Sequence, residues 1–240
     1  MNFSMLRHLL SSLYVPVRHE STLATHNRVF LASIGNPEPE YALTRHNIGH
    51  RFIDHLVTIY WKNHVVKTAD YYTSTKYPSI TIFKSDKCLM NVQGRPISKH
   101  FNRFKNSELI IVQDDLENDV GRYKIRAAGT SPRGHNGLKS VIQHLGNHHR
   151  KLAIGIGKTP PSQHMAQHVL GKFDPRELEI IDYEVFPKVV EELEKILDPP
   201  KRRQKRKTKE KSKKNTESGK TASLERENVE IDSKMVGNAN

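Results

Sequence analysis

Short runs of apolar residues alternate along the chain with longer stretches in which apolar side chains recur every three or four positions. A continuous apolar run predicts a strand, and a period of three to four residues predicts an amphipathic helix. The runs, with one alternating segment at 122–125, place strands at residues 29–34, 79–84, 109–113, 122–125 and 152–156, and a further extended piece ends at 87–90. The periodic stretches place helices at residues 48–60, 97–104, 136–145, 163–170 and 175–197. Strands interleaved with helices predict a three-layer α/β/α fold with a mixed, mostly parallel central sheet.

All of these elements lie within residues 28–197, which we expect to form one domain. Residues 198–240 form a tail of Lys/Arg blocks followed by polar residues, and so few large apolar groups predict disorder. Residues 1–27 carry leucines at helical spacing, two arginines and no acid before Glu20. That composition is typical of a mitochondrial transit peptide, and a disordered extension is the alternative. The sequence therefore favours a mitochondrial protein over a cytoplasmic one.

Charge points to the kind of partner. The formal net charge is +13, and residues 201–214 alone hold ten Lys or Arg and one Glu. Such a basic run indicates a polyanionic partner, with nucleic acid favoured over a membrane surface. The run would either add affinity for RNA or serve as a nuclear import signal. The single cysteine, Cys88, excludes a disulfide framework and a thiolate metal cluster. No apolar stretch approaches the roughly 18 residues that cross a bilayer, so we expect no membrane insertion.

Polar groups cluster at the ends of the predicted strands, where α/β proteins place their sites. The segments are residues 35–37, 44–47, 90–94 and 134–140, and Asp114-Asp115 directly follows the strand at 109–113. A cleft built from them would offer an imidazole, a carboxylate and several carboxamides. An imidazole can take a proton from water while that water attacks a carbonyl, and a carboxylate behind it fixes the tautomer. These groups could perform hydrolysis, but such a pattern alone is more often a structural histidine with turn-forming asparagines.

The same segments resemble the motifs of the bacterial-type peptidyl-tRNA hydrolase family. Residues 34–49 (IGNPEPEYALTRHNIG) are similar to the family's signature, and residues 90–94 (MNVQG) to its second motif. Residues 134–140 (GHNGLKS) and 152–157 (LAIGIG) are similar to its third and fourth. The four motifs occur in the family's order and at compatible spacing, so the resemblance extends over the whole predicted domain.

The resemblance implies hydrolysis of the ester bond between a peptide and its tRNA, by a monomer that needs neither metal nor cofactor. It makes His46 the proton acceptor that activates water and Asp114 the carboxylate that keeps His46 basic. Asn36 matches the residue that distinguishes peptidyl-tRNA from free aminoacyl-tRNA. Further substrate contacts fall on Tyr41, Asn91 and Asn136. The main alternative is a catalytically inactive RNA-binding or ribosome-associated module of the same fold, and a second is an esterase or nucleosidase for small molecules.

Four basic residues near the third motif are candidates for tRNA phosphate contacts, with a solvated basic face as the alternative. They are Lys124, Arg126, Arg133 and Lys139. His135 adjoins the site, and we expect it to order Asn136. The histidines that follow His135 in the sequence lack a His-Glu-x-x-His pattern, so we expect no metal site.

Three departures from the family's pattern concern substrate affinity. The family commonly has Ser at the position of Gln93 and an aromatic residue at the position of Leu89. The loop at 127–133 replaces a glycine-rich approach and carries an arginine toward the site. Because neither His46 nor Asp114 is replaced, we expect the chemistry to be retained and substrate binding to differ.

Overall fold

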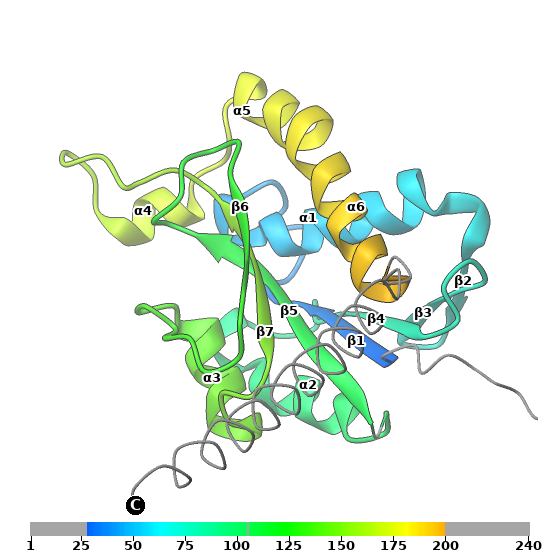
Figure 1. The fold of residues 1–240 in the computed structure, drawn as a ribbon. Coiled ribbons are helices and arrows are strands. Elements are labelled where there is room, and N and C mark those ends of the chain that lie inside the picture. The colour runs from blue at the N-terminus through cyan, green and yellow to red at the C-terminus, as the bar shows by residue number, and fades with distance from the viewer. Residues whose placement is uncertain (1–27, 105, 200–240) are drawn as a thin grey trace, which may run out of the picture. The chain divides into compact units, whose positions relative to one another are not determined.

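A seven-stranded sheet forms the centre of the computed structural model, which describes residues 28–104 and 106–199 (Figure 1). The strands lie in the order β2-β3-β4-β1-β5-β7-β6. Their bounds are β1 Arg28–Ser33, β2 Val65–Thr68, β3 Tyr71–Ser74, β4 Ile80–Lys84, β5 Ser107–Asp115, β6 Tyr123–Arg126 and β7 Arg150–Gly155. The pairs β4–β1, β1–β5 and β5–β7 are parallel, whereas β2–β3, β3–β4 and β6–β7 are antiparallel. The predicted mixed sheet is confirmed, and its parallel part is the centre.

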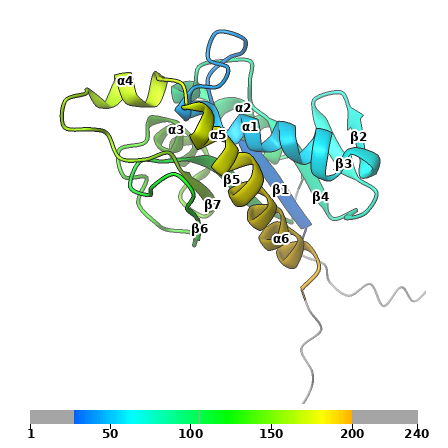
Figure 2. The same cartoon turned by 90° about the horizontal axis from the view of Figure 1, so that it is seen from above.

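Helices cover both faces of this sheet (Figures 1 and 2). Their bounds are α1 Ile48–His55, α2 Gly94–Phe101, α3 Asn136–Leu145, α4 Met165–Leu170, α5 Pro175–Ile180 and α6 Phe186–Leu197. Residues of α2 and α3 share one core cluster with Phe30 of β1, and residues of α1 and α6 share the other with the neighbouring Leu31. Side chains that alternate along β1 therefore enter two cores, which explains why its apolar run is continuous. The predicted three-layer α/β/α arrangement is confirmed.

Two predicted helices continue through turns of wider pitch. The helix expected at 48–60 is α1 followed by the π-helical turn η2 (Leu56–Tyr60). The helix expected at 175–197 is α5, the π-helical turn η5 (Ile181–Val185) and α6. The amphipathic pattern predicts that these segments are helical, but it does not resolve a local change from one hydrogen-bond register to another.

Two predictions of extended structure need correction. The sequence did not reveal β2 and β3, because both strands are short and most of their side chains are partly or fully exposed, which leaves little alternation to detect. Residues 87–90 are not a strand, and Met90 begins the 3-10 turn η4 (Met90–Val92). The side chain of Gln93 donates hydrogen bonds to the carbonyl oxygens of Ser85 and Cys88, which are therefore not free for a neighbouring strand.

The parallel strands bring the candidate residues to one edge of the sheet. Because β1, β4, β5 and β7 run in the same direction, their carboxyl ends meet there, followed by residues 35–36, 85–94 and 156–157. Asp114 and Asp115 belong to β5 itself instead of following it. In the described part of the chain, no helix has the length and apolar character that a membrane span requires. The extension expected at 1–27 and the tail after Pro199 lie outside the described residues.

Candidate active site

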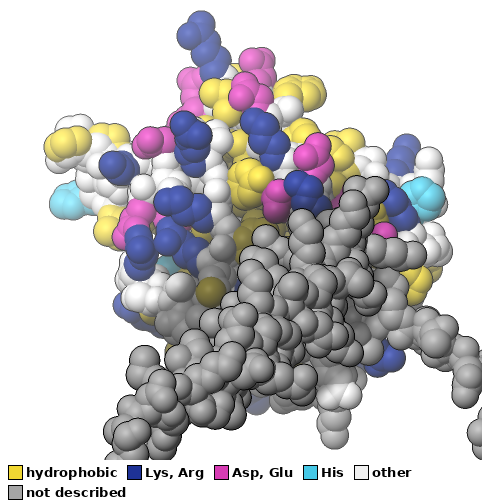
Figure 3. Space-filling view, viewed as in Figure 1, with side chains coloured by type: hydrophobic (Ala, Val, Ile, Leu, Met, Phe, Trp, Pro, Cys, Tyr) yellow, Lys and Arg dark blue, Asp and Glu magenta, His cyan; other side chains and the backbone are white. Residues whose placement is uncertain are grey.

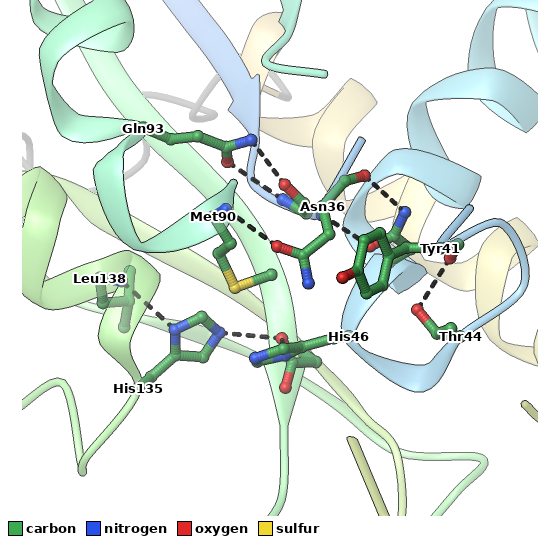
Figure 4. Close-up of polar contacts among 11 residues, drawn as sticks. Asn36, Tyr41, Thr44, His46, Met90, Gln93, His135 and Leu138 are labelled. Atoms are coloured by element: carbon green, nitrogen blue, oxygen red, sulfur yellow. Dashed lines mark hydrogen bonds and ion pairs between the residues drawn. The ribbon is translucent and has the colours of Figure 1, made fainter. Parts of the chain in front are cut away.

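Three titratable side chains from three separate elements meet at the carboxyl end of β5. His46 lies in the 3-10 turn η1 (Arg45–Asn47), Asp114 lies near the end of β5, and His135 is the N-cap of α3. Nδ1 of His46 and Nε2 of His135 each lie 2.8 Å from the same oxygen, Oδ1 of Asp114. Figure 4 shows the imidazole rings of His46 and His135 close to each other, with their centroids 5.2 Å apart. The structure thus brings together the two residues that the sequence singled out and adds a third.

The turn that carries His46 is held in place through its neighbour Arg45. The Arg45 guanidinium donates two hydrogen bonds to the carboxylate of Glu177, at 2.9 and 2.6 Å, and a third of 2.9 Å to the carbonyl oxygen of Ile156. Its guanidinium also lies over the ring of Phe173. A bidentate pair of this kind fixes geometry as well as charge, so η1 is tied both to the end of β7 and to α5.

The shared carboxylate determines which nitrogen of each imidazole carries a proton. An ionised carboxylate only accepts hydrogen bonds, so the facing nitrogens, Nδ1 of His46 and Nε2 of His135, must both be protonated. In His135 the other nitrogen accepts the backbone N–H of Leu138 at 3.3 Å, which caps α3. In His46 the other nitrogen, Nε2, has no hydrogen-bond partner among the described residues. His46 therefore has the one imidazole lone pair of this group that is free to accept a proton.

The pKa shifts follow from the same contacts. Burial alone would raise the pKa of Asp114, but the charges and hydrogen bonds of His46 and His135 outweigh it and hold this pKa well below its ordinary range. Burial would likewise lower the pKa of His46, but the charge and hydrogen bond of Asp114 raise it above the ordinary value of 6.5. The carboxylate is ionised at neutral pH, and it makes the imidazole a stronger base.

A cavity of about 300 Å³ opens beside these three side chains. One wall is polar and includes residues 131–136, among them Asn136. The opposite wall is formed by apolar side chains of α4, with Met165 63% exposed. A cavity with one basic imidazole, hydrogen-bonding groups on one side and an apolar wall on the other suits the attack of water on a carbonyl group of a bound ester.

The remaining sequence-predicted substrate residues lie on the other side of His46. Oδ1 of Asn36 accepts the backbone N–H of Met90 at 2.9 Å, which leaves the Nδ2 amide without a partner among the described residues. Figure 4 shows the Asn36 side chain pointing between Met90 and His46, with the ring of Tyr41 beside it. Asn91 is exposed in η4. Unlike Asn136, none of these residues lines the cavity.

The four basic residues proposed for phosphate contacts differ in their surroundings. Arg126 forms an ion pair with the buried Asp115, and Arg133 pairs with Glu117. Lys139 donates a long hydrogen bond of 3.4 Å to Oδ1 of Asn136. Lys124 is exposed and has no acidic partner among the described residues. Figure 3 shows Lys and Arg side chains interspersed with acids on the face where β6 and α4 lie.

Sequence reasoning missed the role that His135 takes in the structure. It placed His135 beside Asn136 as an ordering residue, whereas the imidazole bonds to Asp114 and caps α3. The same three residues, His46, Asp114 and His135, are the one group in the described part of the chain whose ligand atoms lie close enough to hold a metal ion. The protonated nitrogens of both imidazoles already point at the Asp114 carboxylate, so hydrogen bonds explain why these three residues lie together.

Comparisons with known proteins agree with this geometry. The sequence model of a family described as peptidyl-tRNA hydrolase matches residues 30–217. A peptidyl-tRNA hydrolase from Thermotoga petrophila is 36% identical over 177 residues, which are 70% of this chain and 89% of that protein. One from Synechocystis is 35% identical over 158 residues, or 63% of this chain and 81% of that protein.

Solved structures show the same fold. The crystal structure of a peptidyl-tRNA hydrolase in complex with N-propanol is 25% identical, has a TM-score of 0.58, and covers 72% of this chain and 89% of its own. That of peptidyl-tRNA hydrolase from Acinetobacter baumannii has a TM-score of 0.56 at 24% identity, with 72% of this chain and 96% of its own covered. The chain belongs to the peptidyl-tRNA hydrolase family.

Proposed function

We propose that this protein hydrolyses the ester bond of peptidyl-tRNA and releases free tRNA and the peptide, with His46 as the general base. The observation that carries the proposal is the free Nε2 lone pair of His46, on an imidazole whose other nitrogen is held by the ionised Asp114. The 300 Å³ cavity beside it gives space for the reacting ester. Family membership supports the choice of substrate.

The reaction would begin with a water molecule that donates a hydrogen bond to Nε2 of His46. As its oxygen attacks the carbonyl carbon at the C-terminal end of the peptide, Nε2 takes the proton and the carbonyl oxygen becomes an oxyanion. The imidazolium is stabilised by the Asp114 carboxylate, 2.8 Å from Nδ1. Collapse of the tetrahedral intermediate breaks the bond to the ribose oxygen, which takes the proton back from Nε2, so the enzyme returns to its starting state.

The carboxamides near His46 support a role in binding the acylated end of the tRNA. The free Nδ2 of Asn36 can donate to a carbonyl oxygen, and Asn136 lines the cavity itself. We propose that Tyr41 and the exposed Asn91 complete this binding surface. A free aminoacyl-tRNA presents an ammonium in place of an amide. An ammonium facing the N–H donors of a carboxamide would be left without an acceptor, which disfavours it.

For the tRNA itself, we propose that Lys124 and Lys139 contact phosphates, because neither forms an ion pair with a described acidic residue. Arg126 and Arg133 would contribute only by leaving Asp115 and Glu117. We further propose that the protein acts in mitochondria, on the strength of the transit-like composition of residues 1–27, and we expect it to act there as a monomer. Sequencing the mature N-terminus of the protein isolated from cells would test the location, and cytoplasmic protein with an intact N-terminus would contradict it.

Turnover of an N-acetylated aminoacyl-tRNA by the purified chain tests the function. The expected result is release of free tRNA that is lost in His46→Ala, although this variant still binds tRNA. Binding that falls as salt rises, without turnover in the wild-type protein, would instead establish the inactive RNA-binding module. Equal hydrolysis of a small acyl ester, independent of tRNA and salt, would establish an esterase for small molecules.

A further inference from the structure

The side chain of Gln93 is completely buried, and its carboxamide forms hydrogen bonds only with backbone atoms. Its Oε1 accepts the N–H of Gly35 at 3.1 Å, and its Nε2 donates to the carbonyl oxygen of Gly35 at 2.5 Å. Nε2 also contacts the carbonyl oxygens of Ser85 and, at 2.9 Å, Cys88. Figure 4 shows the paired contacts of Gln93 with the chain just before Asn36. One side chain thus joins the end of β1, the end of β4 and the turn η4.

A second carboxamide repeats this arrangement one residue later. Oδ1 of Asn47 accepts the N–H of Asn36 at 2.7 Å, and its Nδ2 donates to the carbonyl oxygen of Asn36 at 2.9 Å. The backbone donors and acceptors of Gly35 and Asn36, which belong to neither a helix nor a strand, are therefore all bound by the side chains of Gln93 and Asn47. The backbone hydrogen bonds of these two residues are thus satisfied by side chains, in the way that a neighbouring strand satisfies them within a sheet.

Packing leaves Gly35 little room to move away from Gln93. A Cβ atom added to Gly35 would lie 2.6 Å from the ring of His50, so the backbone is enclosed between this buried imidazole and Gln93. The residue after Gln93 is itself anchored: the N–H of Gly94, the first residue of α2, donates to Oγ of Ser140 in α3 at 3.0 Å. Gln93 is therefore held on the side of α2 and α3, and it in turn holds the loop that contains Asn36.

These contacts determine how Asn36 faces the site. The backbone of Asn36 is fixed, and its Oδ1 accepts the N–H of Met90, three residues before Gln93. Only the Nδ2 amide is left to face a substrate, and only while the loop and η4 keep their separation. Gln93 itself touches neither His46 nor Asp114. A change at Gln93 would consequently disturb the carboxamide without altering the base.

We propose that Gln93 is a positioning residue for substrate selection: it sets the distance between the Asn36 loop and η4, and thereby fixes Asn36 as a hydrogen-bond donor to an amide carbonyl of the substrate. The proposal rests on the function proposed above. It assigns to Gln93 an effect on KM and on the preference for N-acylated over free aminoacyl-tRNA, and none on the proton transfer. Removing an interaction that is made equally in the ground state and the transition state raises KM and leaves kcat unchanged.

The test compares Gln93→Leu, which keeps the size but removes every hydrogen bond, with Gln93→Asn, which keeps the amide on a shorter stem. Ser74→Ala is the matched control, because it removes a buried acceptor, that of the Tyr77 N–H at 3.1 Å, in β3. For each variant, kcat and KM are measured on N-acetylated and free aminoacyl-tRNA, together with hydrogen exchange at the amides of Gly35 and Asn36.

In Gln93→Leu we expect KM for the N-acetylated substrate to rise roughly tenfold, with kcat within threefold of wild type and a lower preference over the free aminoacyl-tRNA. Exchange at Gly35 and Asn36 should accelerate, whereas Ser74→Ala should change neither. Unchanged KM and selectivity in a folded Gln93→Leu would overturn the proposal. If Gln93→Leu does not fold, Gln93→Asn provides the same comparison. Absence of turnover in the wild-type chain would count against the proposed function alone. The positioning role would then be overturned separately if hydrogen exchange at the amides of Gly35 and Asn36 in a folded Gln93 variant were as slow as in the wild type.

Discussion

Asp114→Asn separates the charge of the carboxylate from its geometry. In the wild-type structure Oδ1 accepts hydrogen bonds from both His46 and His135, and no described residue donates to Oδ2. An asparagine can place its carbonyl oxygen at the position of Oδ1 and its amide nitrogen at that of Oδ2, so both imidazoles keep an acceptor. The substitution then removes one negative charge from a residue that is 2% exposed, with little change in shape.

The size of the effect follows from Coulomb's law. Two unit charges about 4 Å apart attract each other by about 4 kcal/mol at an effective dielectric constant of roughly 20. This stabilisation acts on the imidazolium of the transition state, so its loss lowers kcat by up to about a thousandfold at 1.4 kcal/mol per tenfold change. The pKa of His46 should fall as well. Asp114 raises it, and the burial that remains lowers it.

Rate profiles against pH test both consequences. The wild-type rate should fall with decreasing pH through a pKa above 6.5, because protonated His46 cannot accept a proton from water. In Asp114→Asn this acidic limb should move to lower pH while kcat on the plateau drops. Far-UV circular dichroism and tRNA affinity serve as controls for folding and binding. A plateau within a few-fold of wild type, with an unmoved acidic limb, would refute the role assigned to the carboxylate.

Four further predictions concern neighbouring groups. Lys124→Gln should weaken tRNA binding and reduce the slope of log Kd against log salt concentration by about one. Arg126→Gln leaves Asp115 without its cation, so the free energy of unfolding measured in thermal or urea melts should fall by about 3 kcal/mol. His135→Asn retains a capping side chain for α3 but loses the bond to Asp114, so kcat should fall by about tenfold with little change in melting temperature. Burial, together with the charge of Lys84, lowers the pKa of His50 to about 3, so the folded state favours its neutral form. Between pH 6.5 and 3 the protein should lose about 1.4 kcal/mol of stability per pH unit through this residue, and His50→Gln should flatten that dependence.

The sequence predicts the centre of the fold well because burial leaves a strong pattern there. β1 and β5 are covered by helices on both faces, and their continuous apolar runs identify them. The helix expected at 136–145 is α3 with the same bounds. The edge of the sheet carries no such signal. β2 contains no buried residue, so it differs little from a loop in its pattern of polar and apolar side chains.

Pairing within the site was harder to predict than its residue types. The imidazole of His46 and the carboxylate of Asp114 are 68 positions apart, and the motifs indicate their proximity only through the family resemblance. The bond of His135 to the same oxygen depends on the angle at which α3 leaves its N-cap, which no local pattern specifies. The same limit applies to charge, since the sequence shows Arg126 as basic but not that Asp115 neutralises it.

The departures from the family's pattern have different physical consequences once their surroundings are known. Leu89 is 49% exposed beside η4, where an aliphatic side chain can contact a substrate but cannot stack as an aromatic ring would. Gln93 is not exposed at all, and its side chain reaches from the end of η4 to both backbone groups of Gly35. One departure therefore lies on the binding surface, whereas the other lies in its support. Both residues flank Asn91 in the sequence, and neither forms a hydrogen bond with His46 or Asp114. They therefore concern which acyl groups are bound, whereas the base that activates water stays the same.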